Sequence, residues 1–500
     1  MQNYQTVEKY FRRISRLAHL RAMAGWDEAV MMPKGGGEAR AMAVSELALL
    51  NVEIYREQAL AEAIKEAQNE LSGLSDWQRA NLREAKSSHA RMNAVDPKLV
   101  EKQTAHCMAS EQAWRELRHA NNWQDFAPIL EKGVEYAREE SRQRAAATGL
   151  KPYDAMLDLY EPGLRITTVE RVFGELRQIL PDLIEEIIVH QAKQKVVSLN
   201  RPVPTEKQRA MMKEFMAWLG FDFERGRLDE SHHPFCGGVP QDVRLTTRYS
   251  EQDYLSGLMG VMHETGHAMY EQGLPKEWLE QPVGAARGMA FHESQSLFVE
   301  MQIARCREFA QYAAPILQRY LSEHGDPAGY WMPENLTLLL TRVRKGYIRV
   351  DADEVTYPAH IILRFEIERA LIEGDLQVKE LPAVWNEKMQ KYLGLSTLGN
   401  DKNGCMQDVH WPSGAFGYFP SYSLGALTAS QLFAALQKQI PTARAGLAKG
   451  EIKPIMDWLR KNVWSQGSAL SSEDLMIKVT GEPLSVQPFI NHVKQRYLRD

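Results

Sequence analysis

The sequence predicts a predominantly α-helical fold with a small β-sheet beside one of its helices. Through the first part of the chain, Ala, Glu, Arg, Gln and Leu recur at helical spacing, as in EARAMAVSELALLNVEIYREQALAEAIKEA. One central stretch, DVRLTTRY at 242–249, instead alternates apolar and polar residues with the period of a strand. Beyond it the chain stays mostly helical, except at WPSGAFGYFPSYSLG (411–425), where glycines, prolines and aromatic residues interrupt the pattern.

Breaker residues divide the earlier helical pattern. Residues 4–148 predict long helices, whereas LKPYDAMLDLYEPGL at 150–164 predicts a loop because of its two prolines and its glycine. The helical pattern resumes at Thr168. We expect a single unit over residues 1–500, with a helical lobe at about 1–160 and a catalytic part at about 165–500.

Composition excludes several classes of protein. A formal net charge of −5, from 60 Lys and Arg against 65 Asp and Glu, lacks the positive excess that nucleic acids or anionic membranes attract. No apolar run reaches the length of about 18 residues that spans a bilayer, and the N-terminus lacks the apolar core of a signal peptide. The four cysteines form no CxxC pair, which fits a reducing compartment. We therefore expect a cytoplasmic protein without nucleic-acid or membrane partners.

The elements around the strand are expected to hold a short motif. The Gly- and Pro-rich stretch at 230–241 predicts a turn. After the strand, Ser250 is expected to cap a helix, with Asp253 in capping-box position, that carries HETGH and ends near Gly273. A second helix is expected to run through MAFHESQSLFVEMQIARCREFAQYAAPIL at 289–317.

The HETGH motif is typical of a zinc-binding pair with a catalytic base. On a helix, His263 and His267 lie about 40° apart around the axis and about 6 Å apart along it, so both imidazoles can reach one ion. Glu264 points to the side of that ion, where it can take a proton from a water molecule. The alternative is a pair of histidines that merely share a helix face. Apolar flanks argue against a surface pair, and a buried Glu264 without partners would be costly.

A catalytic zinc site also needs a third protein ligand and one open position. We predict Glu293, in FHESQS on the second helix, as this ligand of one Zn²⁺ per chain. His292 is the rival ligand, but on a helix its side chain points about 100° away from that of Glu293. We expect His292 to support the site or to pack beside it.

With these residues assembled, the chain resembles the carboxypeptidase Taq family of metallocarboxypeptidases over most of its length. The motifs that carry the resemblance are HPF (233–235), DVRLT (242–246), HETGH (263–267), HESQS (292–296), IRVDAD (348–353) and GCMQDVHW (404–411), which runs into GAFGYFPSY (414–422). The resemblance implies a neurolysin-like, two-lobed zincin fold with a deep groove, usually a homodimer. It also implies removal of single C-terminal amino acids from peptides with broad tolerance, using Zn²⁺ or sometimes Co²⁺.

The family's metal motif falls on His263, His267 and Glu293, with Glu264 as the general base. A carboxypeptidase must also recognise a free carboxylate, and a guanidinium offers that group two parallel hydrogen bonds. Arg349 is the first candidate for this role.

Several alternatives stay open for the substrate-binding residues. Arg349 could instead pair with Asp351 or Asp353. Arg244 is the second candidate, because its strand could also bind the substrate backbone by edge pairing. His233 is expected to shape the loop that positions Asp242 and Arg244.

The oxyanion needs a hydrogen-bond donor opposite the base. Tyr418 is the leading candidate, followed by His410 and Tyr422, although aromatic residues in such loops often only pack. Two other functions remain possible: a helical zinc endopeptidase or oligopeptidase with an open groove, and a non-catalytic peptide-binding scaffold.

Overall fold

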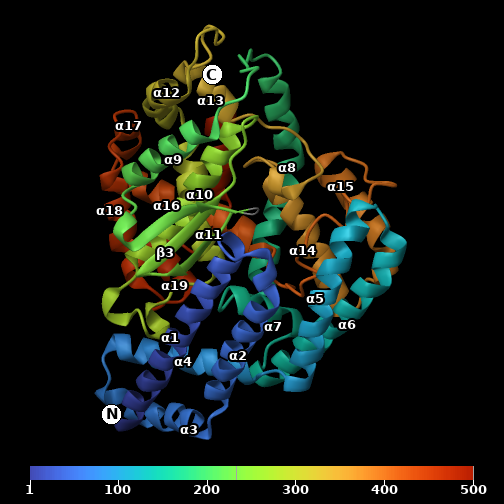
Figure 1. The fold of residues 1–500 in the computed structure, drawn as a ribbon, viewed down its shortest axis with the longest axis vertical. Helices are drawn as coiled ribbons and strands as arrows, with labels where there is room; N and C mark the ends of the chain where they lie inside the picture. The colour runs from blue at the N-terminus through green and yellow to red at the C-terminus, as the bar shows by residue number, and fades with distance from the viewer. Residues whose placement is uncertain (232–233, 499–500) are drawn as a thin grey trace.

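The computed structural model describes residues 1–231 and 234–498, which are mostly helical (Figure 1). The helices before the sheet are α1 (Gln2–Val30), α2 (Gly37–Arg56), α3 (Gln58–Ala67), α4 (Asp76–Asn93), α5 (Pro97–His119), α6 (Trp123–Thr148), α7 (Pro152–Tyr160), α8 (Ile166–Gln191) and α9 (Thr205–Leu219). The strands are β1 (Gly226–Glu230), β2 (Cys236–Val239) and β3 (Asp242–Thr247). The later helices are α10 (Tyr254–Gly273), α11 (Met289–Leu297), η6 (Phe298–Ala304), α12 (Arg307–Leu321), α13 (Pro333–Leu340), α14 (Tyr357–Glu373), α15 (Leu381–Leu393), α16 (Pro420–Gln439), α17 (Ala443–Leu447), α18 (Lys453–Asn462), α19 (Ser472–Thr480) and α20 (Gln487–Tyr497). The predicted helical fold with a small sheet is confirmed.

The predicted strand is β3, the central strand of the sheet. It pairs in parallel with β1 and antiparallel with β2, so both of its edges are hydrogen-bonded within the sheet. The expectation that a peptide pairs with the edge of this strand is therefore wrong, because a strand binds a peptide only through an unpaired edge.

Part of the stretch expected to be a turn is strand β2. Gly238 has a φ of 92°, and a Cβ there would lie 2.1 Å from the backbone oxygen of Asp242. Only glycine allows this close pairing of β2 with β3. Among the described residues of this stretch, the turn is confined to Pro240 and Gln241.

The segment expected to be a loop at 150–164 contains helix α7. Pro152 is the first residue of this helix, a position where the missing N–H of proline costs nothing. It therefore starts the helix instead of breaking one. The predicted cap of α10 is also wrong: the side chain of Asp253 caps it by accepting from the N–H of Ser256, whereas Ser250 holds the preceding turn.

The helix expected over 289–317 is divided into α11, the π-helical segment η6 and α12. A π-helical turn rotates the side chains that follow it around the helix axis, and such turns are frequent at functional sites. Here η6 brings Glu300 to α10, where it contacts His263. The side chain of Cys306 then caps the start of α12.

Two large hydrophobic cores meet along α11 and α16. One gathers residues of α9, α10, α12, α13 and α17–α19, and the other gathers residues of α6–α8, α14, α15 and α20. Helix α11 contributes Phe291 to the first core and Ala290 to the second, and α16 contributes Leu432 and Leu427 in the same way. In Figure 1, α10, α11 and α16 lie between α14 and α15 on one side and α17 and α18 on the other.

The N-terminal helices α1–α4 have a smaller core of their own. Packing nevertheless continues across residue 160, because Tyr153 of α7 and Val169 of α8 share the second large core. The division into lobes and the neurolysin-like groove stay predictions. Within residues 1–231 and 234–498, no helix combines the length and the apolar composition needed to cross a membrane.

Candidate active site

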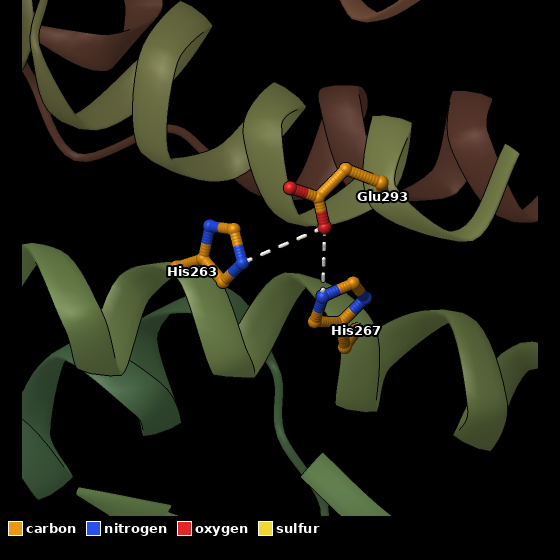
Figure 2. Close-up of side chains that lie close together, drawn as sticks. All are labelled: His263, His267 and Glu293. Carbon is orange, nitrogen blue, oxygen red and sulfur yellow. Dashed lines mark ion pairs between the residues drawn. The ribbon is translucent and has the colours of Figure 1, made fainter. Parts of the chain in front are cut away.

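The three predicted metal ligands converge between α10 and α11 (Figure 2). His263 and His267 lie one turn apart on α10, and Glu293 faces them from α11. Oε2 of Glu293 lies 3.7 Å from Nε2 of His263 and 3.3 Å from Nε2 of His267. One donor atom from each residue lies within 4.8 Å of the others. A single cation could therefore contact all three.

This donor set fits a divalent cation such as zinc. Tetrahedral ligand atoms at about 2.0–2.2 Å from zinc lie about 3.3–3.6 Å from each other. The observed separations of 3.3 and 3.7 Å are close to that value. Two imidazoles and one carboxylate also leave one coordination position open, as catalytic zinc sites require.

Two glycines allow the surrounding helices to approach this closely. A Cβ at Gly266, inside HETGH, would lie 2.5 Å from the backbone oxygen of Gln295 on α11. A Cβ at Gly425 of α16 would lie 2.8 Å from Cγ of Glu293. Any side chain at either position would displace α11 and move Glu293 away from the histidines.

Each histidine ligand is held through its other ring nitrogen. Nδ1 of His263 lies 2.9 Å from Oε2 of Glu300, and the other oxygen of Glu300 accepts a hydrogen bond from Arg305. Nδ1 of His267 lies 2.7 Å from Nδ1 of His292. Both Nε2 atoms therefore face Glu293, and His292 contacts a ligand from behind.

The carboxylates around His263 attract positive charge. Burial opposes a charge on this ring, but Glu293 and Glu300 outweigh burial and raise the pKa of His263 to about 10. Burial lowers the pKa of His267 to about 4. A cation that binds both Nε2 atoms must therefore displace a proton from His263 at neutral pH.

We expect the affinity for a divalent cation to rise about tenfold per pH unit between about pH 7 and 9, because binding releases one proton over this range. Below its pKa of about 10, His263 holds that proton, and raising the pH makes its removal easier. Competition with a chromophoric chelator, corrected for the chelator's own protonation, measures the slope. A pH-independent affinity would contradict this assignment of the proton.

Glu264 lies beside the three ligands and is only 8% exposed. Burial raises the pKa of its carboxyl group to about 7, with His263 opposing the shift and Glu293 adding to it. A group with a pKa near neutral can take up a proton and release it again at the working pH. Its position and its pKa both suit a general base.

Arg349 is buried and held by three groups. Its Nε lies 2.9 Å from Oδ1 of Asp408, its Nη1 donates to the hydroxyl of Tyr357 at 2.9 Å, and its guanidinium lies 4.8 Å from the centre of the Tyr422 ring. These contacts leave Nη2 unused. The guanidinium of Arg349 is thus held in place, and its Nη2 can still donate a hydrogen bond to another group.

The acidic partner of Arg349 is not one of the two that follow it in the chain. Asp353 accepts backbone N–H groups just before α14, and Asp408 binds Arg349 together with Arg364. These two arginines outweigh burial and hold the pKa of the Asp408 carboxyl far below its usual range. The alternative in which Arg349 pairs with Asp351 or Asp353 is wrong.

Tyr418, Tyr422 and His410 are brought together as an aromatic cluster. The two tyrosine rings lie 5.1 Å apart, and Nε2 of His410 lies 3.1 Å from the hydroxyl of Tyr422. Burial raises the pKa of Tyr422 to about 12 and that of Tyr418 well above its ordinary value, with the Glu293 carboxylate contributing to both. Both phenols therefore stay protonated and can donate a hydrogen bond near the metal ligands.

A buried carboxylate fixes the loop that carries Tyr418. Glu368 of α14 accepts hydrogen bonds from the hydroxyl of Tyr153, the indole of Trp411 and the N–H of Gly417, at 2.7, 2.9 and 2.6 Å. Gly417 has a φ of 94°, and a Cβ there would lie 2.6 Å from a backbone oxygen of α7. Only glycine fits, so the position before Tyr418 sets the direction of the loop.

Arg244 and Asp242 lie on β3 and bind each other. Two guanidinium nitrogens of Arg244 donate to the two oxygens of Asp242 at 2.9 and 2.6 Å. The guanidinium also lies 4.5 Å from the ring centre of Trp26 in α1, which joins the sheet to the N-terminal helices. Substrate binding by either residue stays a prediction. His233 lies outside the described residues.

Sequence reasoning missed the residues that support the site from outside, which are Glu300, Arg305, Arg364, Glu368 and Asp408. Glu300 had a local signal, since it stands seven residues, about two helical turns, after Glu293. Asp408 had none, because it is 59 residues away from Arg349 in the chain.

Known proteins resemble this chain over nearly its whole length. Residues 6–497 match the family model for carboxypeptidase Taq (M32) metallopeptidase. Thermostable carboxypeptidase 1 of Thermus thermophilus is 36% identical, over 99% of this chain and 98% of that protein, and carboxypeptidase 1 of Bacillus subtilis is 33% identical over 98% of each. The structure of Trypanosoma cruzi metallocarboxypeptidase 1 covers 100% of both chains with a TM-score of 0.97 at 40% identity. The family suggested by the motifs is confirmed: the chain belongs to the carboxypeptidase Taq (M32) metallopeptidases and is a metallocarboxypeptidase, a peptide-bond hydrolase that uses a divalent metal.

Proposed function

We propose that this metallocarboxypeptidase removes single amino acids from the free carboxyl termini of peptides, with broad side-chain tolerance and with Zn²⁺ as its metal. The observation that carries the proposal is the cluster of His263, His267 and Glu293 with the buried Glu264 beside it. Co²⁺ is a second metal that this donor set suits. When bound, the cation polarises the scissile carbonyl group and lowers the pKa of a water molecule.

The protein's own groups supply the remaining chemistry. Glu264 takes a proton from the attacking water and passes it to the leaving amine nitrogen. Tyr418 donates a hydrogen bond to the carbonyl oxygen as negative charge develops there. Arg349 binds the terminal carboxylate through its unused Nη2. The guanidinium of Arg349 lies 4.8 Å from the centre of the Tyr422 ring, and Gly425, three residues further along α16, lies against Glu293. This arrangement supports placing the carboxylate-binding group close to the predicted metal ligands.

One unblocked peptide and its C-terminally amidated twin test the direction of cleavage. The zinc-loaded protein is expected to remove residues stepwise from the carboxyl end of the free acid, to leave the amide intact, and to lose all activity after chelation. Mass spectrometry of the products reads out all three results. Equal cleavage of both peptides would indicate an endopeptidase, and no cleavage of either would indicate a binding scaffold.

Tyr418→Phe is expected to lower kcat by about 10- to 100-fold with little change in KM, because a hydrogen bond to a charged group contributes about 1.5–3 kcal/mol. Tyr422→Phe is the matched control, since the Tyr422 hydroxyl already contacts His410 at 3.1 Å. Steady-state kinetics of both variants measure the difference. A larger loss of kcat in Tyr422→Phe would transfer the role to Tyr422.

We also propose that the chain forms a homodimer. Apolar side chains on and beside α1 and α2 support this, because Leu20, Met31, Met42 and Leu49 are 57–63% exposed. Large apolar side chains that stay exposed favour burial against another protein surface. Light scattering at two concentrations would measure the mass of the assembly.

A cytoplasmic location is proposed from the cysteines. Cys107, Cys236, Cys306 and Cys405 are all free thiols. Unpaired cysteines fit a reducing compartment. Cell fractionation followed by immunoblotting tests this location.

A further inference from the structure

His267 is connected through His292 of α11 to the carboxylate of Glu271, which lies on α10 together with His267. Nδ1 of His267 lies 2.7 Å from Nδ1 of His292, and Nε2 of His292 lies 2.8 Å from Oε1 of Glu271. Glu271 stands four residues after His267 on α10, so the two side chains share a helix face. Helix α11 supplies the imidazole between them, and the ring of Tyr270 packs against that imidazole at 5.3 Å.

The two contacts determine where the ring hydrogens lie. Nε2 of His267 faces Glu293 and is the atom available to a cation, so it carries no hydrogen when it acts as a ligand. The hydrogen of that ring is then on Nδ1, and Nδ1 of His292 must accept it. A neutral His292 consequently has its own hydrogen on Nε2, from which it donates to Glu271. When Nε2 of His267 is free for a cation and both rings are neutral, the other placement sets two hydrogens against each other.

We propose that His292 and Glu271 are positioning residues that fix the tautomer and the ring orientation of His267 for metal binding. The inference rests on the proposed metal site. The charge of Glu271 polarises His292, which makes Nδ1 of His292 a stronger acceptor and Nε2 of His267 a better donor to the metal. His263 receives the same support directly from Glu300, without an imidazole between them.

Substitutions at His292 separate this role from simple packing. In His292→Asn, the side-chain oxygen occupies about the place of Nδ1 and can still accept from His267. In His292→Gln the amide reaches only toward the place of Nε2, and His292→Phe has no acceptor. Competition with a chelator at fixed pH is expected to show a 10- to 100-fold loss of zinc affinity for the Gln and Phe variants, and a change of only a few fold for the Asn variant.

The Co²⁺-loaded protein gives a readout that does not depend on activity. Because His292 acts behind a ligand and is not itself one, the visible absorption bands of His292→Asn are expected to match those of the parent. Changed bands, or an Asn variant that binds zinc as weakly as the Phe variant, would overturn the inference. So would three variants that all bind zinc like the parent. If the Phe variant does not fold, as monitored by circular dichroism, the comparison of Asn with Gln decides.

Glu271 is tested by combining substitutions. Glu271→Ala is expected to weaken zinc binding by about tenfold in the parent and to have no effect in His292→Phe, where the connection is already cut. The matched control is Glu277→Ala, an exposed glutamate on the segment that follows α10. Equal effects of Glu271→Ala in both backgrounds would contradict a connection through His292. Unchanged zinc binding by His263→Ala and His267→Ala would instead overturn the proposed metal site itself.

Discussion

Glu264→Gln is expected to lower kcat for peptide hydrolysis by up to about 10⁴-fold, the largest contribution usual for a general base. The amide has the shape of the carboxyl group but takes up no proton from the attacking water. Glu264 is not one of the three clustered ligands, so the variant is expected to keep one zinc ion per chain. Steady-state kinetics and metal analysis of the same preparation measure both outcomes. A variant that hydrolyses peptides at the parental rate would exclude Glu264 as the base.

The pH profile of the parent provides an independent check. Burial raises the pKa of Glu264 to about 7, and the base works only when it is deprotonated. We therefore expect kcat/KM to fall about tenfold per pH unit on the acid side of this pKa. A bound cation stabilises the ionised form of Glu264 and so lowers its pKa. The fall of kcat/KM on the acid side is therefore expected below pH 7. The residual activity of Glu264→Gln should lack the limb when the metal is kept in excess at every pH, which is necessary because the affinity for the cation falls as the pH is lowered.

The convergence of the three predicted metal ligands was predictable because their pattern is local. His263 and His267 share a helix face by spacing alone, and Glu293 followed from the need for a third ligand on a neighbouring helix. Gly266 also had a reason in the sequence, since a glycine inside a helix often marks a close approach of another backbone. The order of the strands had no such signal, because β2, which pairs with β3, lies in the stretch that the sequence predicts as a turn.

The residues that hold the ligands were less predictable because they depend on departures from regular structure. The seven-residue spacing from Glu293 hints at Glu300, but Glu300 contacts His263 from the π-helical segment η6, and no rule of spacing predicts where that segment begins. The start of α7 at Pro152 was missed for a different reason, since a proline both breaks helices and begins them. Asp408 reaches Arg349 through the tertiary fold alone.

Arg349→Ala is expected to raise KM for free-acid peptides by about 30- to 1000-fold, because it removes charge-assisted hydrogen bonds that contribute about 2–4 kcal/mol. Amidated peptides lack the carboxylate and should stay as poor as they are with the parent. Arg349→Lys keeps the charge but loses the planar arrangement of donors. Its KM for free-acid peptides should therefore lie between that of the parent and that of Arg349→Ala. An unchanged KM in Arg349→Ala would remove this residue from carboxylate recognition.

Arg349→Ala removes a partner of Asp408 as well as a donor for the substrate carboxylate, and the kinetics must distinguish the two effects. Asp408 loses one of its two arginine partners and keeps only Arg364, so the loop that carries His410 can shift. Such a shift would lower kcat for every peptide, whereas lost recognition raises KM for free acids alone. Arg244→Ala is the matched control, because Nε and Nη2 of that guanidinium already donate to the two oxygens of Asp242. If Arg244→Ala raises KM for free acids more than Arg349→Ala does, carboxylate recognition belongs to the β3 arginine.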